Sequence, residues 1–156
     1  MSKFTRDSAI DLDLPLSFQI AQLHSALNAQ AKAIIARHGN LNIAQWRIIR
    51  LVAWDIANTT TTVRKAAGID KSQFSKTLSV LEREGFVEIL PYEDDKRQHL
   101  IVLTTKGVEA HDRLGPELDA RHQYLLASLN DDQREMIHEA IKALSEAAET
   151  TDFSNV

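Results

Sequence analysis

GIDKSQFSKTLSVL, residues 68–81, is the stretch that decides the fold of this chain. Asp70 can act as a helix N-cap, because its carboxylate accepts backbone N–H bonds that the first turn leaves unsatisfied. Gln73 follows three residues later and completes a capping-box pattern. Apolar residues then recur at helical spacing and predict one buried face: Phe74, Leu78 and Leu81.

The opposite face of this predicted helix is polar and has no acidic residue after the cap. It combines short hydroxyls, one amide and two lysines: Lys71, Ser72, Gln73, Ser75, Lys76 and Ser79. Such a face can lie against phosphate oxygens and base edges without repulsion or bulk. The alternative is an ordinary solvated face, because amphipathic helices usually expose polar residues.

The composition of the chain sets the class of protein. Its 156 residues are 44% hydrophobic and 26% charged, and none is cysteine, so disulfides and cysteine-ligated zinc are excluded. No apolar run is long enough for a transmembrane helix, and residues 1–13 lack the apolar core of a signal peptide. We therefore expect a helix-rich, cytoplasmic protein with no membrane partner.

The net charge of −4 is distributed unevenly along the chain. Residues 1–58 carry a net charge of +2, residues 59–107 carry +1, and residues 108–156 carry −7. Within residues 59–80, four basic residues accompany a single acid, the cap Asp70. Local charge decides where a polyanion docks, so the acidic C-terminal third does not exclude DNA at the predicted helix.

The flanking segments predict a helix-turn-helix followed by a hairpin. A short helix from about Thr61 to Ala67 ends at Gly68, and the turn leads into the polar-faced helix. Strands at residues 86–90 and 100–103 then enclose a charged tip, and a hairpin in this position is a wing. Lys96 and Arg97 at the tip suit the electronegative minor groove, although a solvated turn is the alternative.

Four further helices are predicted from caps and apolar spacing. The first follows Pro15 and runs to about Arg37, and the second is capped by Asn42 with Gln45 as its partner. Thr104 caps a helix that runs towards Ser128, with a kink or break expected at Gly115-Pro116. Asn130 caps the last helix, whose predicted inner face is Met136, Ile137, Ala140, Ile141, Leu144 and Ala147.

From Leu16 to Ala148 the chain resembles the MarR family of winged helix-turn-helix transcription regulators. The resemblance rests on the segments at residues 41–47, 68–76, 81–87, 95–97 and 103–107, taken in their order and spacing. It implies a mostly α fold with a small two- to three-stranded antiparallel sheet. The winged lobe would span residues 41–104 of a single domain, residues 1–156, and residues 15–38 and 105–149 would form dimerisation helices.

The resemblance also implies a function: a homodimeric repressor that binds a pseudo-palindromic site in double-stranded DNA, without a cofactor. The implied DNA contacts are Thr61, Arg64, Lys65, Lys71, Ser72, Gln73, Ser75, Lys76, Lys96 and Arg97. A small aromatic or phenolic effector would release such a regulator from DNA, and its implied contacts are His24, Trp46, Arg47 and Arg50. A core role for the tryptophan and solvation of the arginines are the alternatives for this second set.

Other classes of function are less well supported by the sequence. The six histidines are scattered, no HExxH pair is present, and phosphate-loop, dinucleotide and Gly-x-Ser-x-Gly motifs are missing, so we expect no catalytic and no metal site. A metal-responsive regulator and a helical protein–protein module with an incidental helix-turn-helix remain the alternatives. The sequence does not identify the operator or the target genes, and it leaves open whether an effector exists and whether binding represses or activates transcription.

Overall fold

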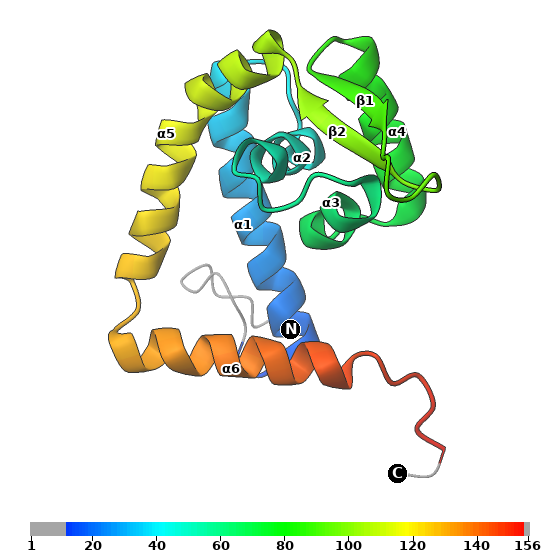
Figure 1. The fold of residues 1–156 in the computed structure, drawn as a ribbon. Helices are drawn as coiled ribbons and strands as arrows, with labels where there is room; N and C mark the ends of the chain where they lie inside the picture. The colour runs from blue at the N-terminus through cyan, green and yellow to red at the C-terminus, as the bar shows by residue number, and fades with distance from the viewer. Residues whose placement is uncertain (1–11, 155–156) are drawn as a thin grey trace, which may run out of the picture. The chain divides into compact units, whose positions relative to one another are not determined.

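The computed structural model describes residues 12–154, and Figure 1 shows its ribbon. The chain divides into two compact units, the first ending at Leu118 and the second beginning at Asp119. In order, the elements are α1 (Leu16–His38), α2 (Ile43–Ala53), α3 (Thr60–Ala67), α4 (Lys71–Arg83), β1 (Val87–Pro91), β2 (His99–Leu103), α5 (Thr105–Ala127) and α6 (Asp131–Ala147). The expected mostly helical fold with a small antiparallel sheet is confirmed.

Helix starts follow the capping residues that the sequence contains. Around Asn42 both bonds of the capping box form, at 2.9 Å from the Gln45 backbone N and 2.8 Å to the Gln45 side chain. At Asp70 only the carboxylate bond forms, at 2.9 Å from the Gln73 backbone N, so the capping box predicted there is half complete. The side-chain amide of Gln73 therefore takes no part in this cap.

The short helix α3 begins at Thr60, one residue before the start expected from the sequence. The reason is that Thr59 caps it, accepting a hydrogen bond from the Thr62 backbone N at 3.3 Å. The Thr62 hydroxyl in turn accepts from the Thr59 backbone N at 3.2 Å. Threonine is a poor helix former but a good cap, so the threonine run sets the boundary.

The core of the first unit forms around α2, which contacts α1, α3, α4 and β2 (Figure 1). The predicted apolar face of α4 is buried in this core, together with side chains from α2, α3 and both strands. Its most deeply buried members are Ile48, Ile49, Val63, Leu81, Val87 and Ile101. Full burial of each such side chain contributes about 1.5–3 kcal/mol, so the inward face of α4 is strongly determined.

The sheet is a two-stranded antiparallel hairpin, with pairing from Val87↔Leu103 to Pro91↔His99. β1 lies one residue later than the expected strand, and β2 begins one residue earlier. An isolated bridge from Thr59 to Leu100 ties the segment before α3 to β2. The hairpin is thus tied to the helix-turn-helix through β2, near the end of the strand pair that adjoins the tip.

The end of α4 is joined to the start of α5 by several close contacts. The Thr104 hydroxyl donates to the Gly85 carbonyl at 2.5 Å, and Lys106 Nζ donates to the Glu84 carbonyl at 2.6 Å. A Cβ at Gly107 would lie 2.2 Å from the Phe86 carbonyl oxygen, so only glycine fits there. The Thr104 cap predicted for α5 is confirmed by a 3.1 Å bond from the Gly107 backbone N.

The remaining helices carry apolar faces that the chain itself leaves exposed. α5 runs through Gly115 and Pro116 without a break. α6 has the predicted Asn130–Gln133 capping box, but its expected inner face is not buried. Residues exposed on α1 and α6 include Leu16, Phe18, Ile20, Leu23, Met136, Ile137, Ile141 and Leu144. The predicted inner face of α6 is thus exposed in the single chain.

We expect Gly107→Ala to lower the free energy of unfolding by about 1–3 kcal/mol, because the added methyl group overlaps a backbone carbonyl that cannot move without displacing α4. Thermal unfolding followed by circular dichroism measures this change. Thr105→Ala, an exposed position at the start of the same helix, is the control and should stay within about 0.5 kcal/mol. Equal unfolding temperatures for Gly107→Ala and the wild type would contradict the close approach.

Candidate nucleic-acid interface and adjacent pocket

The outer face of α4 is exposed and free of acidic side chains as far as Ser79. The exposed residues are Lys71, Ser72, Gln73, Ser75, Lys76 and Ser79, and the buried ones are Phe74, Thr77, Leu78 and Leu81. The Ser75 hydroxyl donates to the Lys71 carbonyl at 3.0 Å, and that of Ser79 to the Ser75 carbonyl at 2.9 Å. The two hydroxyls therefore fold back onto the helix backbone. They project less from the helix than the longer side chains beside them.

The turn between α3 and α4 is tightly defined. Gly68 adopts a left-handed conformation with φ 65° and ψ 37°, which favours glycine. Ile69, the next residue, is buried in the same core as Phe74, so the two residues flank the Asp70 cap from the apolar side. These contacts fix the direction in which α4 leaves the turn.

Basic residues surround this helix-turn-helix. Thr61 and Lys65 are exposed on α3, and Arg64 is half-buried. Lys96 and Arg97 are exposed at the tip of the β1–β2 hairpin. All ten residues implicated in DNA contact thus belong to the first unit, and all of them reach solvent at least in part.

The hairpin tip is held by Asp95. Its carboxylate accepts hydrogen bonds from the Arg97 backbone N at 3.0 Å and from the Gln98 side chain at 3.3 Å. The Asp95 carbonyl also accepts from the Gln98 backbone N at 3.0 Å. The acid therefore shapes the turn, and the cationic side chains of Lys96 and Arg97 remain at the exposed tip.

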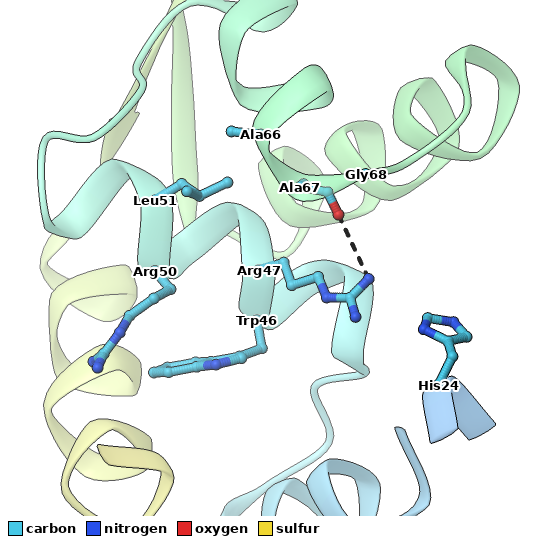
Figure 2. Close-up of a pocket in the computed structure, with 8 residues that line it drawn as sticks. All are labelled: His24, Trp46, Arg47, Arg50, Leu51, Ala66, Ala67 and Gly68. Atoms are coloured by element: carbon cyan, nitrogen blue, oxygen red, sulfur yellow. Dashed lines mark hydrogen bonds between the residues drawn. The ribbon is translucent and has the colours of Figure 1, made fainter. Parts of the chain in front are cut away.

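A pocket of about 490 Å³ lies beside the helix-turn-helix in the first unit (Figure 2). It is lined by His24 from α1, by Trp46, Arg47, Arg50 and Leu51 from α2, and by Ala66, Ala67 and Gly68 at the end of α3. The structure thus brings together the four residues that the sequence suggested as effector contacts. Trp46 is 7% exposed, so it contributes to the core as well as to the pocket wall.

Arg50 is held by aromatic rings on one side of the pocket. Its guanidinium carbon lies 3.3 Å from the Trp54 ring centroid and 5.4 Å from that of Trp46. Its Nη1 donates to His111 Nε2 at 3.0 Å, and this assigns the neutral imidazole proton to Nδ1, 3.3 Å from Asp112 Oδ1. Burial lowers the pKa of Arg50 from its ordinary value. Sequence reasoning missed His111 and Trp54.

Arg47 occupies the other side of the pocket. Its Nη1 donates to the Ala67 carbonyl at 3.5 Å, and its Nη2 donates to Asn28 Oδ1 at 3.3 Å. The Asn28 amide nitrogen lies 2.9 Å from His24 Nε2. Sequence reasoning missed Asn28, although its position four residues after His24 places both on one face of α1.

Residues 12–154 hold no group of three or more metal-binding side chains close enough to share an ion. None of the helices in that range is long and apolar enough to cross a membrane.

No protein-family model matches the chain, but it is similar to curated regulators. The HTH-type transcriptional regulator FarR of Neisseria gonorrhoeae is 25% identical over 130 residues, which cover 83% of this chain and 88% of FarR. The homoprotocatechuate degradative operon repressor of Escherichia coli is 25% identical over 122 residues, covering 78% of this chain and 82% of the repressor.

Solved structures share the fold. A MarR/EmrR family regulator from Acinetobacter sp. ADP1 has a TM-score of 0.79 and 22% identity, over 91% of this chain and 100% of that one. NadR in complex with 4-hydroxyphenylacetate has a TM-score of 0.69 and 26% identity, over 90% of this chain and 97% of NadR. MepR of S. aureus bound to DNA has a TM-score of 0.72 and 18% identity, over 86% of this chain and 99% of MepR. The α3–α4 helix-turn-helix, the β1–β2 wing and these similarities together show that the chain has the winged helix-turn-helix fold of MarR-type regulators and is similar to curated HTH-type transcriptional regulators.

Proposed function

We propose that the protein is a homodimeric repressor that binds a pseudo-palindromic operator and is released from it by a small aromatic acid or phenol. The observation that carries the proposal is the exposed, acid-free face of α4 beside a cationic wing. A mobility shift with the region upstream of its own operon at low salt tests the proposal. A folded dimer that shifts no such fragment would favour the protein–protein module instead.

In this proposal the two elements of the interface have different roles. Ser72, Gln73, Ser75 and Lys76 face base edges in the major groove, where the Gln73 amide can form two hydrogen bonds with adenine. Thr61, Arg64, Lys65 and Lys71 contact the sugar–phosphate backbone beside this groove. Lys96 and Arg97 reach the flanking minor groove, whose narrow, electronegative floor attracts cations.

The uncovered apolar residues of α1 and α6 support the homodimer. Large side chains such as Phe18 on α1 and Met136 on α6 are about 60% exposed. A monomer rarely exposes so many apolar residues in one stretch, and a second copy would bury them. The acidic excess after residue 108 would then lie in the dimerisation helices, away from DNA.

The pocket supports an aromatic, acidic effector. Its volume of about 490 Å³ falls in the usual range for small-ligand sites, and it combines the indole wall of Trp46 with two guanidinium groups. An aromatic ring can pack on the indole, while Arg47 and Arg50 pair with a carboxylate or phenolate. NadR was solved with 4-hydroxyphenylacetate, and the E. coli relative is named as a homoprotocatechuate operon repressor. Both compounds are hydroxylated aromatic acids.

We expect Arg97→Ala to weaken binding to every DNA sequence by a similar factor. Loss of one phosphate-proximal cation should also reduce the slope of log K against log salt by about one. Fluorescence anisotropy with specific and scrambled duplexes over a salt series measures both effects. Arg134→Ala in the second unit is the charge-matched control, and an unchanged salt slope for Arg97→Ala would remove the wing from the interface.

We expect Gln73→Ala to have a different effect from loss of the wing cation. Removal of a base-reading amide should relax the preference at one base pair in each half-site, by about 1–3 kcal/mol of discrimination. Selection of bound sequences from a randomised operator library measures this preference. The salt slope should stay at its wild-type value, and an unaltered base preference would show that another residue reads that position.

We expect Ile141→Glu to raise the dissociation constant of the dimer on the order of tenfold or more, because a carboxylate would be buried without a partner. Sedimentation velocity over a concentration series measures the dimer. Lys142→Glu introduces the same side chain at the adjacent exposed position and serves as the control. Equal association of Ile141→Glu and the wild type would exclude α6 from the dimer interface.

A further inference from the structure

Arg47 connects two elements of the first unit across the pocket. One end of its guanidinium contacts Asn28 on α1, and the other contacts the Ala67 carbonyl at the end of α3. Figure 2 shows the second contact as a line from the arginine to the last residue before Gly68. The side chain therefore reaches from the pocket to the turn of the helix-turn-helix.

The Ala67 carbonyl needs such a donor. The last four carbonyls of an α-helix have no partner within the helix. At the end of α3, the Gly68 and Ile69 backbone N–H groups return to the Lys65 and Arg64 carbonyls, at 3.1 and 3.3 Å. Arg47 supplies a donor to Ala67 and places a positive charge at the negative end of the helix dipole.

Both hydrogen bonds of Arg47 are longer than is usual. They measure 3.5 and 3.3 Å, whereas well-formed N–H···O bonds are about 2.7–3.2 Å long. A carboxylate can accept two parallel bonds from one guanidinium, and such charge-assisted bonds are shorter and about twice as strong. An anion that entered the pocket would therefore compete successfully for Arg47.

We propose that Arg47 couples the pocket to the helix-turn-helix: an aromatic carboxylate draws the guanidinium away from the Ala67 carbonyl and uncaps α3 at the turn that leads into α4. The proposal rests on the proposed effector function and specifies its regulation. Loss of the cap loosens the turn at Gly68, so α4 is held less firmly in the orientation that fits DNA. A ligand then lowers DNA affinity through one positioning residue, by favouring the uncapped state.

Asn28 determines where the guanidinium rests without a ligand. Because Asn28 Oδ1 accepts from Arg47, its amide nitrogen must donate to His24 Nε2. That chain of hydrogen bonds orients Arg47 along the pocket wall and places its second nitrogen near Ala67. Asn28 is therefore a second positioning residue, which acts through Arg47.

Hydrogen exchange of the backbone amides of Gly68 and Ile69 tests the cap in the ligand-free protein. We expect Arg47→Met, which removes the donor and keeps the apolar stem, to raise their exchange rates about threefold to tenfold. Arg47→Lys, which retains one charged donor, should have a smaller effect. Circular dichroism establishes that each variant is folded.

Arg134 offers a matched control in the second unit. Its Nε donates to the Leu126 carbonyl at 3.0 Å near the end of α5, a contact of the same kind. Arg134→Met should leave the exchange of Gly68 and Ile69 unchanged. Wild-type exchange at these two amides in folded Arg47→Met would overturn the proposal.

The ligand step is tested with 4-hydroxyphenylacetate, and its neutral amide is the control compound. Tryptophan fluorescence reports binding, because Trp46 lines the pocket. We expect the carboxylate to raise exchange at Gly68 and Ile69 in the wild type and to cause no further rise in Arg47→Met. An equal rise in both proteins, or none in the wild type despite binding, would overturn the coupling. If the wild type does not bind the carboxylate, both the proposed aromatic-acid effector and the ligand step are wrong. The exchange rates of ligand-free Arg47→Met would still show whether Arg47 caps α3.

Discussion

Burial of one face of α4 is the interaction on which the rest of the structure depends. Phe74, Leu78 and Leu81 pack in one cluster with side chains from α2, α3 and the hairpin. A helix that buries these residues must turn its serines, Gln73 and lysines outwards. The polar face is thus presented to solvent by the same packing that stabilises the fold.

Both ends of α4 are held by groups from elsewhere in the chain. At its end, Thr104 and Lys106 bond to the carbonyls of Gly85 and Glu84. Before its start, Arg47 reaches the carbonyl of Ala67. The contacts at the end of α4 are short and tightly packed, whereas those of Arg47 are long. The contacts that hold the segment before α4 are therefore weaker than those that hold its end.

Contacts between α1 and α5 complete the frame that holds the pocket. Glu117 on α5 accepts hydrogen bonds from His38 and Arg37 at the end of α1, and these two donors lower the pKa of its carboxyl group. Arg113 also donates to the His38 carbonyl at 2.9 Å. The end of α1 is therefore joined to α5, and His24 and Asn28 lie on the same helix α1 further from this joint.

The sequence by itself determined the helices and most of their starts, because caps and apolar spacing act between residues three or four positions apart. Asn42 with Gln45, Asp70, Thr104 and Asn130 all cap as predicted, and α4 buries the predicted face. Only the tertiary structure decided that His111 and Arg50, 61 positions apart, share a hydrogen bond and that Trp46 stacks on His111. It also showed that the predicted inner face of α6 is exposed in the single chain. Such contacts depend on how whole helices pack, and no local pattern of residues records which distant side chains will meet.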